Sequence, residues 1–301
     1  MSYRYTVYGL IIASCLELPE LIPADGVADI CIQWGEVPAT LPGARKTTQR
    51  FQAKPGYLLF FADQVARLLV SHGNKVVIEP IPGATEAEIR TFTLGSALGA
   101  ILHQRGLLPI HASGIKTGHG CVMFCGRPGA GKSTLAGAFV ERGFELHADD
   151  LCVIGMRTGG IPQVYPAYPR LKLWGDALLT MGKKPDDYHR IPTVPDKFAV
   201  QTHRFNREPL PVDRIYLFSP QGADDMAIMP ITGMNRYQVL KQQTYRRRFL
   251  EGLGTTTAHF QLTSLIGKSV PLYRVHRPRD LSHLDCLVDF LVHHIRQGAD
   301  K

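Results

Sequence analysis

Three glycines, a lysine and a serine stand near the middle of the chain at a spacing suited to phosphate binding. The residues from Gly126 to Ser133 satisfy the pattern G-x-x-x-x-G-K-[ST]. In such a loop the glycines let the main chain approach the phosphates, the lysine reaches the β- and γ-phosphates, and the hydroxyl binds Mg²⁺. The candidate ligand-binding residues are Gly126, Arg127, Pro128, Gly129, Ala130, Gly131, Lys132, Ser133 and Thr134.

The residues on either side of this loop predict the elements that must position it. Cys121–Cys125 is a short apolar run typical of a buried strand, and Ser133–Arg142 has helical spacing that Gly143 ends. The unpaired N–H groups at the start of that helix attract an anion. A glycine-rich turn with an incidental Lys-Ser pair is the alternative, and the matching flanks disfavour it.

Two adjacent carboxylates follow in the next predicted strand, Phe144–Ile154. Asp149 and Asp150 should point to opposite faces of that strand and therefore have different roles. One can orient or deprotonate an attacking hydroxyl while the other holds Mg²⁺ or a positioning group. The alternative is a strand that ends at the surface, but apolar residues follow at once and burying charge is costly.

The amino-acid composition restricts the class of protein but does not identify its ligand. The chain has 301 residues, of which 45% are hydrophobic, and a formal charge of +8, which suits a nucleotide, an acidic peptide or nucleic acid. Six cysteines without a CxxC pair predict reduced thiols and a cytoplasmic protein. Ile12–Cys15 resembles a lipoprotein cleavage site, but its flanks argue against export. No apolar run approaches ~20 residues, so no membrane helix is expected.

The order of predicted elements distinguishes the chain from ordinary doubly wound nucleotide-binding proteins. A helix over Thr85–Arg105 is followed by a strand over Leu107–Ile115, and a turn at Lys116–Gly120 leads straight into the loop's own strand. A β-hairpin therefore precedes the phosphate loop, where a crossover helix is usual. We expect a small β-rich region over 1–84 and a catalytic domain over 85–301. Further predictions are strands at Val212–Phe218 and Leu272–Val275 and helices at Asn235–Gly252 and Leu281–Ile295.

A family resemblance follows from this order. The strand Leu108–Ser113, the hairpin, the loop and the Ala148–Asp150 segment resemble the catalytic domain of the HPr kinase/phosphorylase superfamily. That superfamily shares its nucleotide fold with ATP-dependent phosphoenolpyruvate carboxykinases. The branch it resembles most is that of the serine kinases of lasso-peptide clusters. The resemblance implies an α/β fold with a P-loop mixed sheet.

The resemblance also implies roles for single residues. Lys132 and Ser133 would hold phosphates and Mg²⁺, Asp149 would be the general base, and Asp150 would lie near the metal. His111 would lie near the reacting groups. On the residues alone, His111 is more simply a core histidine, and both interpretations stay open.

The sequence departs from the family pattern in places, and these departures limit what the resemblance implies. The second glycine-containing signature of the bifunctional enzymes is missing between Gly155 and Pro195, so neither phosphorylase activity nor HPr as substrate is implied. A basic residue such as Arg170 or Lys197 can stabilise charge on the transferred phosphoryl group. The basic run Arg246–Arg248 is either a solvent-exposed face of a helix or a positively charged surface that attracts an acidic leader peptide.

These observations predict a Mg²⁺- and ATP-dependent kinase that phosphorylates a serine hydroxyl of a peptide or protein, such as a ribosomally made peptide precursor. Nucleic acid and membrane are not expected partners. Bifunctional members of the superfamily form hexamers, so a homo-oligomer is possible, although no interface can be recognised in the sequence. A small-molecule hydroxyl kinase and a non-catalytic nucleotide-binding regulator are the alternatives.

Overall fold

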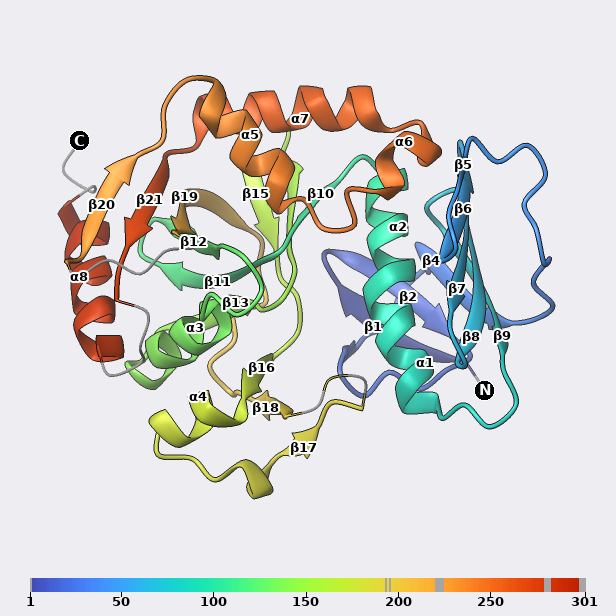
Figure 1. The fold of residues 1–301 in the computed structure, drawn as a ribbon, viewed down its shortest axis with the longest axis horizontal. Helices are drawn as coiled ribbons and strands as arrows, with labels where there is room; N and C mark the ends of the chain where they lie inside the picture. The colour runs from blue at the N-terminus through green and yellow to red at the C-terminus, as the bar shows by residue number, and fades with distance from the viewer. Residues whose placement is uncertain (1, 193, 195, 220–224, 279–282, 298–301) are drawn as a thin grey trace. The chain divides into compact units, whose positions relative to one another are not determined.

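The computed structural model describes residues 2–192, 194, 196–219, 225–278 and 283–297. These residues form two compact units, and the chain passes between them more than once (Figure 1). The first unit contains the residues up to Pro109 together with Thr244–Leu265, and the second contains Ile110–Gln243 and the residues from Ile266 onward. The sequence predicts a division into 1–84 and 85–301. That division assigns the helical segment after residue 84 to the catalytic part, whereas in the structure this segment belongs to the first unit.

The first unit is built on a nine-stranded mixed sheet. Its strand order is β3-β1-β2-β4-β9-β8-β7-β6-β5, in which β4 pairs in parallel with both β2 and β9 and the other pairs are antiparallel. The strands are β1 (Tyr3–Val7), β2 (Leu10–Ser14), β3 (Ile22–Pro23), β4 (Ile30–Trp34), β5 (Lys46–Thr47), β6 (Phe51–Lys54), β7 (Tyr57–Ala62), β8 (Ala66–Ser71) and β9 (Lys75–Pro80).

A helical run follows this sheet, as the sequence predicts. It consists of α1 (Glu86–Phe92), a π-helical segment (Thr93–Ala97) and α2 (Leu98–Gln104). Thr85 begins it with a capping box, because its hydroxyl accepts from the N–H of Glu88 and the Glu88 carboxylate accepts from the N–H of Thr85. The short strand β10 (Leu108–Ile110) then lies where the chain passes to the second unit.

The helix expected over Asn235–Gly252 is wrong as a single element. α5 (Met234–Gln243) ends where the chain leaves the second unit, and α6 (Phe249–Leu253) begins after an irregular segment in the first unit. Arg246 has a left-handed backbone in that segment, with φ of 50°. Phe249 packs edge-on against Phe51 with ring centroids 4.9 Å apart, so packing on the sheet fixes α6 separately. α7 (Thr256–Ser269) follows.

The second unit is also a mixed α/β structure. One sheet has the order β14-β15-β19-β12-β11-β13, with β20 and β21 joined to it at β19, and a smaller sheet has the order β16-β18-β17. The remaining elements are β11 (Ala112–Thr117), β12 (Gly120–Cys125), α3 (Lys132–Glu141), β13 (Glu145–Ala148), β14 (Cys152–Met156), β15 (Pro162–Tyr165), β16 (Arg170–Trp174), α4 (Gly175–Thr180), a 3-10 turn (Pro185–Asp187), β17 (His189–Arg190), β18 (Lys197–Gln201), β19 (Leu210–Phe218), β20 (Ala227–Pro230), β21 (Leu272–His276) and α8 (Leu284–Gln297).

Several predicted elements of this unit are confirmed. β11 and β12 form the expected hairpin, with Ala112 opposite Cys125 and Thr117 opposite Gly120. The strands at β19 and β21 and the final helix lie where the sequence predicts, although residues 281 and 282 at the start of that helix are outside the described part of the chain.

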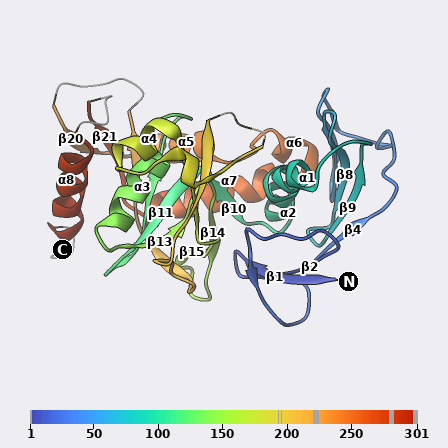
Figure 2. The ribbon, with the colours of Figure 1, turned by 90° about the horizontal axis from the view of Figure 1, so that it is seen from below.

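The core of the second unit holds the phosphate loop between a buried strand and a buried helix. Every residue of β12 is buried, and α3 packs against α8 and the sheet (Figures 1 and 2). The rings of Phe124 on β12 and Phe139 on α3 stack with centroids 5.3 Å apart. Because both ends of the loop are fixed by this packing, its conformation is largely set before any ligand binds.

The strand expected over Phe144–Ile154 is broken at the acidic pair. β13 ends at Ala148, and β14 starts at Cys152. β13 pairs with β11, so it does not lie directly beside the loop's strand β12. The two carboxylates therefore stand on a bend between strands, and the alternation rule of a continuous strand does not apply to them.

Candidate active site

The loop between β12 and α3 depends on glycines with left-handed backbones. Gly126, Gly129 and Gly131 have φ of 155°, 79° and 73°. Such angles are strained for residues that carry a Cβ. Gly131 is the N-cap of α3, and the N–H of Gly126 donates to Oε1 of Gln243 at 3.2 Å. The loop thus leads main-chain N–H groups to the positive end of a buried helix.

The predicted phosphate-binding lysine is the first residue of α3, and its side chain folds back over the loop. Lys132 is 6% exposed, and its Nζ donates to the carbonyl oxygens of Gly126 at 3.0 Å and Arg127 at 3.1 Å. Burial lowers the pKa of Lys132, while the carboxylates of Asp149 and Asp150 oppose that shift. An ammonium hydrogen-bonded to neutral carbonyl oxygens can exchange them for an anion, which it binds more strongly.

The two hydroxyls after the lysine differ in exposure. Ser133 is half-buried, whereas Thr134 is 5% exposed. Mg²⁺ bound with a nucleotide needs few protein ligands, because phosphate oxygens and water supply the rest. Among the described residues no three His, Cys, Asp or Glu side chains form a metal-binding group.

The acidic pair follows β13 and includes a residue in a strained conformation. Asp150 has φ of 70°, in the left-handed region that residues other than glycine seldom occupy. Such strain persists where surrounding contacts hold it, and it concentrates at functional sites. The main-chain oxygen of Asp150 accepts a hydrogen bond from Nδ1 of His111 at 2.8 Å, which is one of those contacts.

Asp149 is the buried member of the pair. It is 2% exposed, its Oδ1 accepts from the hydroxyl of Ser113 at 2.6 Å, and its Oδ2 accepts from the N–H of Lys172 at 2.7 Å. These bonds join the bend to two strands, since Ser113 is on β11 and Lys172 is on β16. Asp149 is thus held firmly between elements.

Asp150 is the member that reaches the surface. Its side chain is 29% exposed, and its Oδ2 lies 2.7 Å from Nζ of Lys172. Burial alone would raise the pKa of Asp150, but the charge of Lys172 and its hydrogen bond outweigh this effect and hold the pKa well below the usual range. The pKa of Lys172 is raised: its partners Tyr168 and Asp150 outweigh the opposing effect of burial. Both groups are charged at neutral pH.

Lys172 was not among the residues predicted from the sequence to stabilise the transferred group, although the sequence contains a signal for it. On β16, Leu171 and Leu173 are buried, and alternation places the lysine between them on the opposite side of the strand. Arg170 and Lys197 were the expected sources of positive charge. The ammonium of Lys197 lies 5.7 Å from the centre of the Trp174 ring. The lysine that contacts the acidic pair directly is Lys172.

His111 lies beside this pair, between β10 and β11. Its Nδ1 bonds the Asp150 carbonyl, and the same nitrogen is 3.5 Å from Oδ1 of Asp150. Burial lowers the pKa of His111 and the charge of Lys132 adds to this effect, against the pull of Asp150. The histidine is therefore neutral near pH 7, and its Nδ1–H donates to the Asp150 carbonyl.

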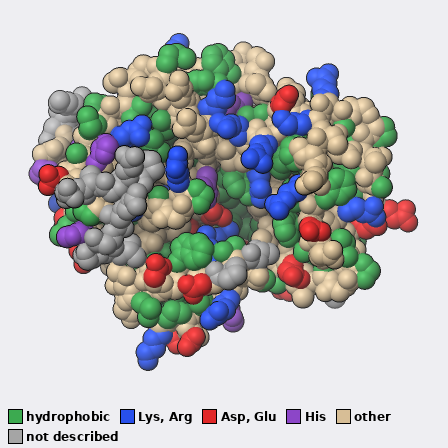
Figure 3. Space-filling model, viewed as in Figure 1, with side chains coloured by type: hydrophobic (Ala, Val, Ile, Leu, Met, Phe, Trp, Pro, Cys, Tyr) green, Lys and Arg blue, Asp and Glu red, His purple; other side chains and the backbone are tan. Residues whose placement is uncertain are grey.

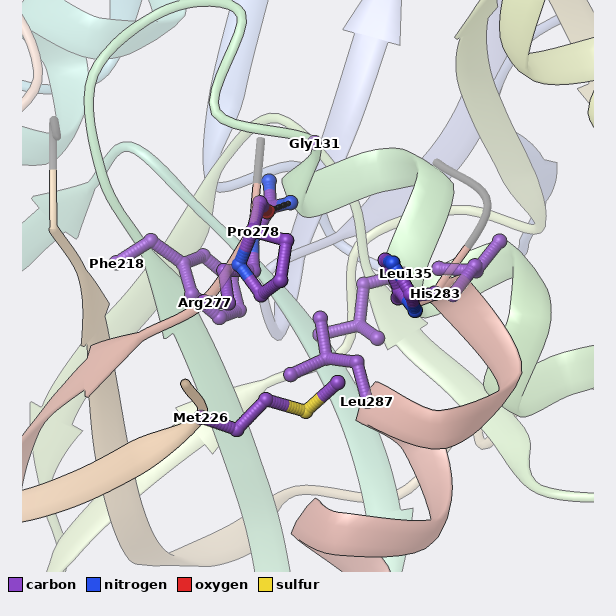
Figure 4. Close-up of a pocket in the computed structure, with 9 residues that line it drawn as sticks. Gly131, Leu135, Phe218, Met226, Arg277, Pro278, His283 and Leu287 are labelled. Carbon is purple, nitrogen blue, oxygen red and sulfur yellow. Dashed lines mark hydrogen bonds between the residues drawn. The ribbon is translucent and has the colours of Figure 1, made fainter. Parts of the chain in front are cut away.

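A pocket opens beside the start of α3. Its empty volume is about 330 Å³, including space open to solvent. Figure 4 shows Arg277 and Pro278 next to Phe218, with Met226 and Leu287 lining the pocket below them. The lining residues are Gly131, Leu135, Phe218, Met226, Arg277, Pro278, His283, Leu284 and Leu287.

The surface carries charge of both signs. Basic side chains are frequent on the face of the molecule in Figure 3, and acidic ones lie among them. Within the described part of the chain, no helix has both the length and the apolar character needed to cross a membrane.

Comparison with known proteins gives similarity to solved structures but to no family model or curated protein. No protein-family model matches the chain, and no curated protein matches it. Among solved structures, it is similar to the HPr(Ser) kinase/phosphatase from Coxiella burnetii, with 13% sequence identity and a TM-score of 0.33. The similarity covers 64% of this chain and 99% of that one.

Proposed function

We propose that this protein is an ATP- and Mg²⁺-dependent kinase that transfers the γ-phosphoryl group to a serine hydroxyl of a peptide or protein. The observation that carries the proposal is the combination of a glycine loop at a buried helix N-terminus with a clamped acidic pair in the same unit. Nucleotide binding alone would need only the loop. A strained carboxylate held against a lysine and a histidine supplies the second half of a phosphoryl-transfer site.

The loop would bind the nucleotide's phosphates. Lys132 exchanges the carbonyl oxygens of Gly126 and Arg127 for the β- and γ-phosphates, and the N–H groups at the start of α3 donate to them. When bound, Mg²⁺ neutralises charge on those phosphates, and Ser133 is the residue that would hold it. The site therefore stabilises the charge that spreads over the transferred group.

The acidic pair would act on the acceptor. Asp150 is the carboxylate that reaches the surface, so we assign it the orientation and deprotonation of the attacking hydroxyl. Asp149, with both oxygens bonded and its side chain buried, is assigned the positioning of the bend. These assignments differ from those that the family resemblance implies, in which Asp149 is the general base and Asp150 lies near the metal.

Lys172 would supply positive charge at the same point. Its ammonium keeps Asp150 ionised and adjoins the place where the acceptor oxygen and the γ-phosphoryl group must meet. In a loose transition state the hydroxyl needs to lose its proton only late, so a carboxylate of low basicity suffices. His111 holds the main chain of Asp150 and is a positioning residue in this scheme.

A serine in a peptide is the acceptor that fits the family resemblance, and the formal charge of +8 suits an acidic precursor. Nucleotide binding is tested first, by calorimetric titration of Mg-ATP into the wild-type chain and Lys132→Ala. We expect binding by the wild type and a loss of at least about tenfold in the variant. Equal binding by both proteins, with the variant folded, would remove the loop from the proposal.

A further inference from the structure

We infer that the pocket beside α3 binds the base of the nucleotide, stacked on the guanidinium of Arg277. This inference rests on the proposed function. It adds a site for a flat aromatic ring, next to the loop that would hold the phosphates.

The position of the pocket follows from the sheet. β12, β19 and β21 are neighbouring parallel strands, so their carboxyl ends lie along the same edge. The first leads into the phosphate loop, the second ends at Phe218, and the third is followed by Arg277. Ligands of open α/β sheets bind in the crevice at this edge.

The pocket's floor is apolar and belongs to the core. Leu135 on α3 and Leu287 on α8 are 1% and 4% exposed, and Met226 is partly buried beside them. Leu284, at the first position of α8, is partly exposed at the rim. A purine ring buries well on such a surface, whereas a phosphate or a sugar does not.

Arg277 gives the pocket a fixed planar wall. Its guanidinium lies 5.4 Å from the centre of the Phe218 ring. Its Nη2 donates to the main-chain oxygen of Ala130 at 2.9 Å, and its Nη1 donates to that of Pro278 at 2.8 Å. With its edge anchored in this way, the guanidinium presents a face, and planar cations stack on aromatic rings.

The same contacts connect the pocket to the phosphate loop. Ala130 and Gly131 belong to the loop, and Gly131 both caps α3 and lines the pocket. A ligand with phosphates at the helix N-terminus can therefore place an attached ring in the pocket without any rearrangement of the sheet. A nucleoside triphosphate has this combination of groups, and inorganic triphosphate has only the first.

The test compares Mg-ATP with Mg-tripolyphosphate by calorimetric titration into the full chain. Leu284→Trp fills the pocket from α8, and Met226→Trp fills it from the segment before β20. Leu179→Trp is the matched control, because Leu179 is 64% exposed on α4 and does not line the pocket. Thermal unfolding of each variant shows whether it is folded.

We expect both filling variants to weaken Mg-ATP binding by at least about tenfold, the scale of one stacked base, and to leave tripolyphosphate binding within about twofold. The control should bind both ligands like the wild type. Folded filling variants that bind ATP normally, or that lose both ligands equally, would overturn the base site. A wild type that binds ATP no better than tripolyphosphate would also overturn it while leaving the phosphate loop intact. A wild type that binds neither ligand would overturn the proposed function and the base site together.

Discussion

Lys172 contacts both members of the acidic pair, with its N–H 2.7 Å from Oδ2 of Asp149 and its Nζ 2.7 Å from Oδ2 of Asp150. One residue of β16 thus fixes the buried carboxylate through its main chain and neutralises the exposed one through its side chain. The main-chain contact does not depend on the side chain, so substitutions of Lys172 isolate the second function.

Replacing Lys172 tests that function. Lys172→Met should lower kcat by about a hundredfold, because the positive charge beside the acceptor is lost. It should also lower the free energy of unfolding by about 1–3 kcal/mol, since Asp150 keeps its charge without its closest partner. Lys172→Arg restores the charge and should recover most of the stability. Steady-state kinetics and urea titration measure the two effects.

A merely structural lysine would give a different result. In that case Lys172→Met would lose stability, but the folded fraction would keep the wild-type kcat. Normal turnover per folded molecule would therefore contradict the role proposed for Lys172.

The two aspartates should differ when each loses its charge. Asp150→Asn should lower kcat by about 10²–10⁴-fold while Mg-ATP still binds, because the acceptor hydroxyl loses its base. Asp149→Asn should mainly lower the free energy of unfolding, by about 1–3 kcal/mol, because an amide cannot accept both of its hydrogen bonds as well. Kinetics, calorimetry and thermal unfolding of the two variants separate the roles. The opposite pattern would restore the assignment implied by the family resemblance.

Acid should destabilise both units through buried histidines. His103 lies in the first unit and His147 in the second, and burial lowers the pKa of each to about 4. Both must be neutral in the folded state, so between pH 6.5 and about 4 the unfolded chain binds more protons. Stability is full above pH 6.5 and falls on acidification, by up to about 3 kcal/mol per histidine.

The contacts of His147 provide a variant for this prediction. Its Nε2–H donates to the Val164 carbonyl, and its Nδ1 accepts from the amide of Asn206. His147→Gln cannot be protonated, so its stability should change less between pH 7 and pH 4.5 than that of the wild type. Urea unfolding at the two pH values measures this change. An equal change in the free energy of unfolding for the variant and the wild type would contradict the role given to His147.

Two glycines of the loop separate backbone strain from crowding. Gly129 and Gly131 both have left-handed backbones, but a Cβ at Gly129 would meet nothing within 4 Å, whereas one at Gly131 would lie 3.1 Å from Nη2 of Arg277. Gly129→Ala should cost about 1–2 kcal/mol from strain alone. Gly131→Ala should cost more and weaken Mg-ATP binding further. Thermal unfolding measures the stability of the two variants, and calorimetry measures their affinity for Mg-ATP. Equal losses in both variants would contradict the close contact between Gly131 and Arg277.

The sequence predicted those parts of the site that depend on neighbouring residues. The hairpin, the loop and α3 lie where the glycines and apolar runs indicate, because turn chemistry and burial act over short distances. The break after Ala148 was not predicted. Its left-handed Asp150 is held by His111 and Lys172, which are 39 and 22 positions away along the chain.

The remaining features depend on how distant segments assemble. The pocket takes Phe218, Arg277 and Leu287 from three separate elements, so no short pattern marks it. The division of Asn235–Gly252 between two units has the same origin, since its apolar spacing fits one helix and only packing on the first sheet separates α6. Tertiary contacts outweighed local preference at these positions.

Phosphorylation of a serine peptide is the most direct test of the account. The chain is incubated with Mg-ATP and a serine-containing peptide encoded beside its gene, and the peptide's mass is measured for the wild type, Lys132→Ala and Asp150→Asn. We predict a gain of one phosphate group with the wild type, lost when serine is replaced by alanine and lost with both variants. Transfer that is equally fast with Lys132→Ala, or ATP consumption that leaves every tested peptide unmodified, would contradict a serine kinase working through this loop.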